Sequence, residues 1–212
     1  MDWRSFCSEV TEKWLSKQEP IGGEGVVVEI DETLIVRRKY NRGRVLKSIW
    51  LFGGIERITK RVFIIPLTTE NCEKRDKAAL IPLVQKYILP GSIIYSDCWA
   101  AYKLMCKLGY QHDSVNHSTN FVSQENPDIH TRNIERLWRD VKQWIRRPGI
   151  RKDYLEQYLS RYLFIRSHNE KELLHHFLKE AAKLYQLQSE NQRTVQTVFN
   201  TESKESSESS ED

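Results

Sequence analysis

The spacing of apolar residues along the chain predicts an alternation of β-strands and helices. Strands are predicted where apolar, β-branched residues run together or alternate with polar ones: Val26–Ile35, Ser48–Gly54, Arg61–Leu67, Ser92–Tyr95 and, at an edge, Ser114–Val115. Helices are predicted where apolar residues recur every three or four positions: residues 3–16, 74–88, 98–108, 133–146, 153–166 and 171–187.

The order of these elements favours an α/β fold of the RNase H-like, retroviral-integrase type, in which helices flank a mixed sheet. Three strands come first, followed by a helix, a strand, a helix, a strand and then helices. We therefore predict an N-terminal helix and linker over residues 1–23 and an RNase H-like core over 24–187. We expect the Ser/Glu-rich tail over 188–212 to be disordered.

Charge is distributed unevenly along the chain and favours a polyanionic partner. The net charge is +4, but residues 201–212 hold five acids and one base, so they contribute −4 and the rest carries +8. Such a balance is typical of nucleic-acid-binding proteins and also of ordinary basic proteins. The four isolated cysteines fit a reducing compartment. We predict neither a membrane helix nor a secretory signal, so we expect no membrane partner and no secretion.

Three acidic residues stand where an α/β fold could bring their side chains together. Asp31 interrupts an apolar strand, Asp97 follows the end of a strand, and Glu135 lies at the start of a helix. Carboxylates are the ligands that Mg²⁺ prefers, and pairs of divalent ions catalyse phosphoryl transfer on DNA. Each acid also has a structural explanation: a solvated strand end or an arginine pair for Asp31, a helix N-cap for Asp97, and an ion pair with Arg139 for Glu135.

Basic residues gather in two places that suit DNA phosphates. The segment RRKYNRGR reads as a turn and holds five of them, Arg37, Arg38, Lys39, Arg42 and Arg44. On the helix predicted over 133–146, three more share one face with Glu135, namely Arg139, Lys142 and Arg146. We predict phosphate contacts at both places, with a solvated turn and a solvated helix face as the alternatives. His117 and His130 could approach a metal site, although a lone histidine is more often structural.

Seven blocks of the sequence resemble Merlin transposases and their bacterial insertion-sequence relatives. They cover roughly residues 2–170 in order and read DWRSFCSEV, VVVEIDET, RRKYNRGR, LFGGIER, YILPGSIIYSDCWAAY, GYQHDSVNHSTNFV and HTRNIERLWRDVK. The resemblance implies a DDE transposase core that uses two Mg²⁺ or Mn²⁺ ions to cut DNA at transposon ends and to join the cut strand to a target. Full-length relatives carry an N-terminal DNA-recognition region, and the resemblance here begins at the linker that precedes the core.

The same resemblance implies roles for particular residues. The catalytic and metal-binding acids would be Asp31, Asp97 and Glu135, and Asn133 is an alternative third residue because some bacterial relatives carry Asn. Lys142 corresponds to a lysine that accompanies the acids in some relatives. The implied partners are terminal inverted repeats, target DNA and further copies of the chain in a homo-oligomer on DNA. The implied location is the nucleus in a eukaryote and the cytoplasm otherwise.

Two other functions are compatible with the sequence. The chain could be a domesticated core that holds DNA or another partner without cutting, and metal-dependent nicking would separate that function from a transposase. It could also be another RNase H-like nuclease, such as a resolvase or a ribonuclease. A preference for terminal repeats over RNA–DNA hybrids would exclude the latter.

Overall fold

The computed structural model describes residues 2–35, 49–67, 77–97, 105–115, 129–145 and 152–186. Internal packing divides the chain into two compact units. One unit is Gln18–Leu163, and the other combines Met1–Lys17 with Phe164–Asp212. The unit that contains the sheet therefore ends at Leu163, before the limit of 187 that the helix pattern suggests for the core.

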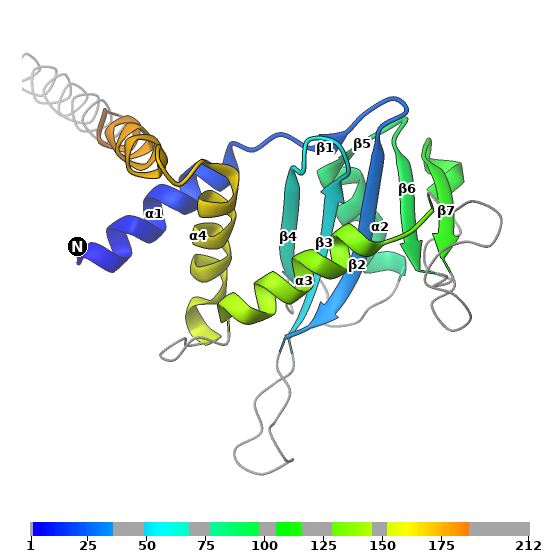
Figure 1. Ribbon diagram of the computed structural model, residues 1–212, viewed down its shortest axis with the longest axis horizontal. Coiled ribbons are helices and arrows are strands. Elements are labelled where there is room, and N and C mark those ends of the chain that lie inside the picture. Colours follow the sequence, from blue (N-terminus) through cyan, green and yellow to red (C-terminus); the bar gives the residue numbers. More distant parts are fainter. Residues whose placement is uncertain are drawn as a thin grey trace, which may run out of the picture. The chain divides into compact units, whose positions relative to one another are not determined.

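A mixed sheet forms the centre of the unit Gln18–Leu163 (Figure 1). Its five strands are β2 (Val27–Leu34), β3 (Trp50–Glu56), β4 (Val62–Leu67), β6 (Ile93–Asp97) and β7 (Gln111–Val115). They lie side by side in the order β4-β3-β2-β6-β7. β3 is antiparallel to both β4 and β2, whereas β6 is parallel to both β2 and β7. This order and these directions are those of an RNase H-like sheet, so the predicted fold class is confirmed.

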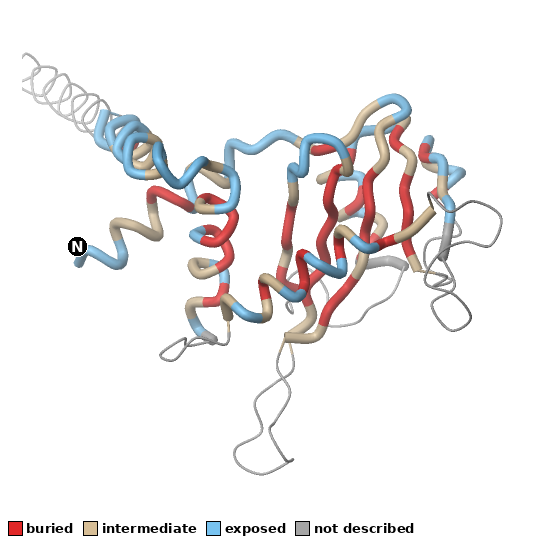
Figure 2. The backbone as a smooth tube through the Cα atoms, viewed as in Figure 1, coloured by how far each residue is buried: buried red, intermediate tan, exposed pale blue. Residues whose placement is uncertain are grey.

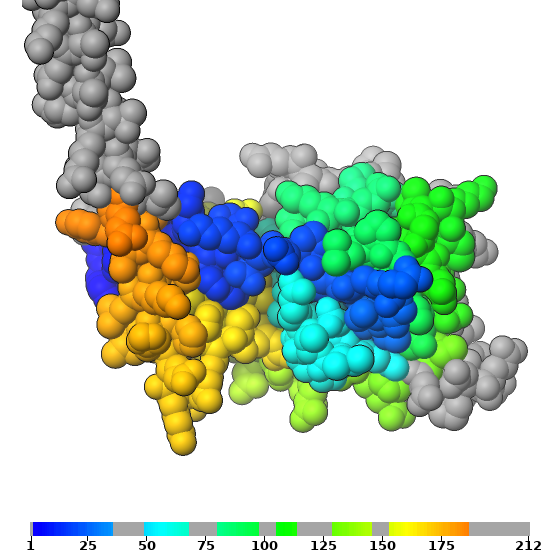
Figure 3. Space-filling view, turned by 90° about the horizontal axis from the view of Figure 1, so that it is seen from above, coloured from blue at the N-terminus to red at the C-terminus, as the bar shows by residue number. Residues whose placement is uncertain are grey.

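Two short parallel strands tie the segment before β2 to the end of helix α2 (Lys77–Tyr87). They are β1 (Ile21–Gly22) and β5 (Ile88–Leu89). Gly25 N–H also donates to Gly91 O at 3.0 Å. Seen from above, the blue residues of this segment lie between cyan and green ones (Figure 3). The sequence predicts only a linker here, because two-residue strands carry no hydrophobic period.

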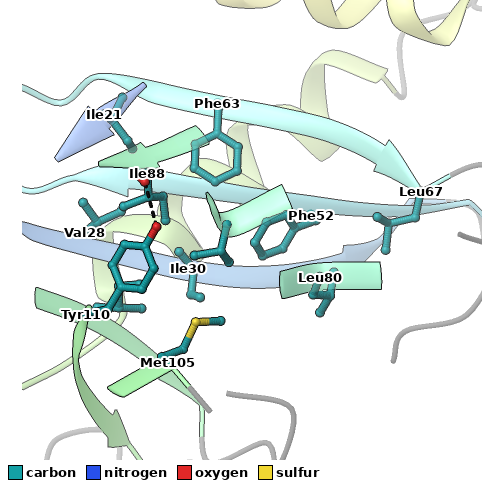
Figure 4. Close-up of a cluster of buried hydrophobic side chains, with 12 residues drawn as sticks. Ile21, Val28, Ile30, Phe52, Phe63, Leu67, Leu80, Ile88, Met105 and Tyr110 are labelled. Carbon is teal, nitrogen blue, oxygen red and sulfur yellow. Dashed lines mark hydrogen bonds between the residues drawn. The ribbon is translucent and has the colours of Figure 1, made fainter. Parts of the chain in front are cut away.

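One face of the sheet carries a buried apolar cluster that also includes Leu80 and Val84 of α2 (Figure 4). Burial of apolar surface is the main stabilising contribution there. The buried cluster consists of Ile21, Val28, Ile30, Phe52, Phe63, Leu67, Leu80, Val84, Ile88, Ile94, Met105 and Tyr110. The Tyr110 hydroxyl donates to Ile88 O at 2.9 Å, so its polar end is satisfied inside the cluster. Met105 belongs to a 3₁₀ turn over 105–108, and the rest of the helix predicted over 98–108 lies outside the described residues.

Helix α3 (Arg132–Ile145) covers the opposite face, over β2 and β3 (Figure 1). Its buried residues are Ile134, Leu137, Trp138 and Val141, and Figure 2 shows them as red patches along the helix. Ile134, Leu137 and Val141 recur with Trp144 at the three- and four-residue spacing of a helix. Trp144 is half-buried and donates its indole N–H to Tyr158 O at 3.2 Å. α3 is therefore held on the sheet by one apolar side, which leaves its other sides available for polar residues.

In the second unit, Met1–Lys17 with Phe164–Asp212, the described residues are largely helical. α1 (Trp3–Ser16) begins at Asp2, whose side chain accepts a hydrogen bond from Ser5 N. The last part of α4 (Leu155–Ser167) and a helix over 173–186 also belong here. Aromatic rings connect them, since Trp14 and Phe164 have centroids 5.1 Å apart and Phe164 and Phe177 have centroids 6.1 Å apart. Within the described ranges, no helix has the length and apolarity needed to span a membrane.

Candidate active site

Asp31 and Asp97 lie on neighbouring parallel strands at the same level of the sheet. β2 and β6 pair as far as Glu29 and Tyr95, and the two acids come two residues further along each strand. Because side chains alternate along a strand, both acids share the face that Glu29 occupies. Their charges interact. Asp97 is the last residue of β6, and Asp31 lies in β2 just beyond the stretch that pairs with β6, where the antiparallel and parallel halves of the sheet meet. The carboxyl ends of parallel strands are where α/β sheets commonly bind ligands.

The Asp31 carboxyl is largely buried, and its environment disfavours the ionised form. Burial raises its pKa to about 7, and the nearby charges of Glu32 and Asp97 add to the effect. Trp138 acts in the other direction, because its indole N–H donates to Asp31 Oδ2 at 3.0 Å. A buried carboxylate beside a second carboxylate is an arrangement that a cation stabilises, and such shifted pKa values concentrate at functional sites.

Glycine opposite Asp31 makes room for the Trp138 ring. Gly53 pairs with Asp31 across β2 and β3. A Cβ at Gly53 would lie 2.6 Å from Trp138 Cη2, a distance that side chains do not tolerate. Trp138 is buried, and its contact with Asp31 was not predicted from the sequence. The available signals were the Gly-Gly pair in β3 and the need of a buried indole N–H for an acceptor.

Glu135 lies on α3, one turn before Trp138, so the two are neighbours on the helix surface. Its side chain is exposed and accepts a hydrogen bond from Thr131 Oγ1 at 3.3 Å. Over the described ranges, no three His, Cys, Asp or Glu side chains are grouped closely enough to hold a metal ion. The structure therefore brings Asp31 and Asp97 together and carries Glu135 on the helix that contacts Asp31, without closing a three-acid cluster.

Asn133, the alternative third residue, is engaged elsewhere. Its amide Nδ2 donates to Glu29 Oε1 at 2.7 Å, and its Oδ1 accepts from Lys60 Nζ at 3.0 Å. Both polar ends of the Asn133 side chain are thus used in holding the start of α3.

A buried network around Glu29 was not predicted from the sequence. Glu29 is fully buried, and Arg57 Nε donates to its Oε1 at 2.7 Å. His130 joins this network, since its Nδ1 lies 3.0 Å from Arg57 Nη2. Burial and the Arg57 charge lower the pKa of His130, which favours the neutral imidazole as the acceptor of that hydrogen bond. The signal in the sequence was a second acid, Glu29, in an apolar strand, which requires a partner when buried.

The predicted basic residues are only partly described. On α3, Arg139 is exposed and Lys142 is half-buried, on the same side of the helix as Glu135. Arg146, His117 and all five basic residues of the segment over 37–44 lie outside the described residues. Their assignment to DNA contacts stays a prediction.

The strand order and the pair of acids define an RNase H-like protein. The ISXO2-like transposase domain family matches residues 20–167, and the chain belongs to this family. An uncharacterized transposase-like protein of Haemophilus influenzae is 30% identical over 83 residues, which cover 39% of this chain. The matched part spans 65% of the length of that relative.

Solved structures that share the fold include viral integrase catalytic cores. The BIV integrase core is 13% identical, with a TM-score of 0.43 and coverage of 75% of this chain and 97% of that chain. The HTLV-2 integrase core in complex with magnesium is 13% identical, with a TM-score of 0.40 and coverage of 66% and 84%. These overlaps are partial, and the assignment of the fold rests on the strand order described above.

Proposed function

We propose that this chain is the catalytic core of a Merlin-type DDE transposase. It would cleave DNA at transposon ends and join the cut strand to target DNA, with divalent ions held by Asp31, Asp97 and Glu135. The observation that carries the proposal is the position of Asp31 and Asp97 on adjacent parallel strands, each two residues beyond the pair Glu29–Tyr95, with an unfavourable charge interaction between them. The ISXO2-like family match supports the same reaction class.

The residues present fit Mg²⁺ or Mn²⁺ in their chemistry. Carboxylate oxygens are hard ligands, and the elevated pKa of Asp31 indicates that this carboxylate lacks full compensation of its charge. Glu135 is exposed, so it can turn toward Asp31 by rotating side-chain torsions without repacking the core. A bound pair of divalent ions would supply activation of a water or a 3′-hydroxyl and stabilisation of the leaving oxygen.

The side chains of this protein would orient the carboxylates and the DNA. Trp138 holds one oxygen of Asp31 through its indole N–H. Lys142 and Arg139, on the same side of α3 as Glu135, would contact phosphates next to the cleaved bond. The proposed partners are terminal inverted repeats, target DNA and further copies of the chain. The net charge of +8 outside residues 201–212 supports a polyanionic partner.

Metal-dependent nicking tests the proposal. The full chain would be incubated with a supercoiled plasmid that carries the DNA flanking its gene, with Mg²⁺ or Mn²⁺ or with EDTA. We expect nicking only with a divalent ion. Asp97→Asn should lower the rate more than about 100-fold, since the loss of an outer-shell partner alone typically costs about 10 to 100-fold. Glu56→Gln, a buried acid on the other face of the sheet, serves as the control.

Three outcomes would contradict the proposal. Nicking by Asp97→Asn at the parent rate would remove the acid pair from the chemistry. Binding of the flanking DNA without any cleavage would support a domesticated binding protein instead. Cleavage of RNA–DNA hybrids in preference to the flanking repeats would favour a ribonuclease.

A further inference from the structure

A second set of side chains lies beside the proposed catalytic acids, and its members on β2 and β6 come two residues before those acids on the same face of the sheet. We call it the support cluster, and it consists of Glu29, Arg57, Tyr95, His130 and Asn133. Three of its members come two positions before a proposed catalytic acid, in the pairs Glu29–Asp31, Tyr95–Asp97 and Asn133–Glu135. The elements that carry the acids, β2, β6 and α3, therefore also meet in the support cluster.

Glu29 caps α3 from the neighbouring strand. It is fully buried, and its Oε2 accepts from the backbone N–H groups of Asn133 at 2.9 Å and Ile134 at 3.1 Å. Its Oε1 accepts from Asn133 Nδ2 at 2.7 Å. The first N–H groups of a helix have no partner within the helix, and a negative charge there is favoured by the helix dipole. Glu29 thus fixes the start of α3 on β2.

Arg57 connects this cap to the other two elements. Its Nε donates to Glu29 Oε1 at 2.7 Å, and its Nη2 donates to His130 O at 2.7 Å. Its guanidinium carbon stands 4.7 Å from the centre of the Tyr95 ring on β6, within the range of a cation–π contact. The segment that enters α3 and the strand that ends at Asp97 are therefore bound through one arginine.

We infer that Glu29 is a positioning residue for the transposase reaction, because it sets where α3 presents Glu135 relative to Asp31 and Asp97. The inference rests on the proposed function. An α-helix turns by about 100° for each residue, so a shift of α3 by one position would rotate Glu135 away from the site. Apolar packing of α3 alone permits small shifts, whereas directional hydrogen bonds to a buried carboxylate do not. A buried ion pair is weak evidence for added stability, so the inference rests on the hydrogen bonds from Glu29 to the start of α3.

The test compares Glu29→Gln with Glu56→Gln in the full chain. Glu56 is also buried and accepts from Gly22 N at 3.1 Å and Thr59 Oγ1 at 2.7 Å, but it pairs with Val28 and so faces away from α3. Glu29→Gln keeps the shape of the side chain but replaces one carboxylate oxygen with an NH2 group. That group would face the N–H donors that the oxygen now accepts from. Both variants would be measured at a temperature at which circular dichroism shows them fully folded.

Two measurements report on the position of α3. The first is the NMR signal of the Trp138 indole N–H in metal-free protein, identified by its loss in Trp138→Phe, because this group contacts Asp31. The second is the rate of metal-dependent nicking. We expect Glu29→Gln to shift the indole signal and to lower the maximal nicking rate by about 10 to 100-fold, as outer-shell partners do. Glu56→Gln should change neither.

Asn133→Ala is the milder variant if Glu29→Gln does not fold. It removes the Nδ2 donor and retains the backbone hydrogen bonds to Glu29, so we expect a smaller shift of the indole signal and a smaller loss of rate. Parent values for both measurements in the folded Glu29 or Asn133 variant would overturn the inference. Equal losses in Glu29→Gln and Glu56→Gln would also overturn it. If the parent protein shows no metal-dependent nicking, the proposed function fails, while the indole signal still decides whether Glu29 positions α3.

Discussion

Asp31 is held in an environment that costs free energy when its carboxyl ionises. Its side chain is largely buried beside Asp97 and Glu32, and its pKa is raised from 3.8 to about 7. Such a raised pKa means that the folded protein holds a proton at Asp31 over a pH range in which the unfolded chain has lost it. Stability and cation binding should therefore both depend on pH through this residue.

Replacement of Asp31 should change how stability depends on pH. Between about pH 4 and 7 the folded state binds more protons at Asp31 than the unfolded state does, so the Asp31 contribution to the free energy of unfolding falls as pH rises. Above about pH 7 the loss of stability from ionising Asp31 is complete. A rise of the pKa from 3.8 to about 7 corresponds to at most about 4 kcal/mol in the free energy of unfolding. Asp31→Asn cannot ionise, and its amide oxygen can still accept from Trp138. Urea denaturation should show its stability advantage growing from about pH 4 to 7 and then levelling.

Divalent ions provide the control for this prediction. At about ten times its dissociation constant, Mg²⁺ should add about 1.4 kcal/mol to the stability of the parent protein at about pH 8. The gain should be much smaller at about pH 5, where Asp31 holds its proton, and absent in Asp31→Asn. A pH-independent difference between the two proteins would show that the Asp31 carboxyl is not the titrating group.

The contact between α3 and the sheet depends on the absence of a side chain at Gly53. A Cβ there would lie 2.6 Å from Trp138 Cη2 and 2.9 Å from the backbone oxygen of Phe63. The ring can move away from the sheet only if α3 lifts or if the hydrogen bond to Asp31 is lost. The close approach of helix and strand at this point thus fixes the geometry of the candidate site.

Gly53→Ala should therefore destabilise the protein by about 1 to 3 kcal/mol, as overpacking typically does. In a Trp138→Phe background the added methyl group should cost less, because phenylalanine lacks the outer indole atoms that it would meet. Chemical denaturation of the parent, both single variants and the double variant gives the coupling energy between the two positions. A coupling near zero would mean that the backbone of β3 moves instead of the ring.

The larger helices and strands could be predicted from the sequence, because each is encoded by a pattern within its own residues. β2 and β4 are runs of β-branched residues, and α3 shows its apolar stripe directly. Asp31 and Asp97 were predicted as a pair because one interrupts an apolar strand and the other follows the end of a strand. The contacts of Trp138 with Asp31 and of Glu29 with the start of α3 join residues more than 100 positions apart. They depend on strand register and on the placement of α3, which no local pattern encodes.

The distribution of charge over the whole chain predicts how it responds to salt. Outside residues 201–212 the chain carries +8, and five basic residues are concentrated at positions 37–44. If that segment contacts phosphates, DNA binding should weaken steeply as salt is added, because each neutralised phosphate releases counterions.

Arg38→Ala together with Lys39→Ala should reduce the slope of log affinity against log salt by about 1.8, or about 0.9 for each lost contact. The loss should be similar for all DNA sequences, since phosphate contacts carry no sequence information. Lys171→Ala together with Lys179→Ala, two exposed lysines, is the matched control and should leave the slope unchanged. Fluorescence anisotropy over a salt series measures both, and an unchanged slope in the first pair would remove the segment from the DNA contact.

The position of Glu29 also affects how the sheet can assemble. If β2 slid by one residue against its neighbours, Glu29 and Asp31 would turn into the apolar cluster beneath α2 and meet no compensating charge. If it slid by two toward its carboxyl end, Val27 would occupy the place of Glu29, and a valine offers nothing to Arg57 or to the first N–H groups of α3. A slide by two the other way would place the shorter Asp31 there and remove the acid from the candidate site. A carboxylate in the middle of an apolar strand therefore makes misaligned sheets unfavourable, so the residue that holds the helix also selects the correct alignment during folding.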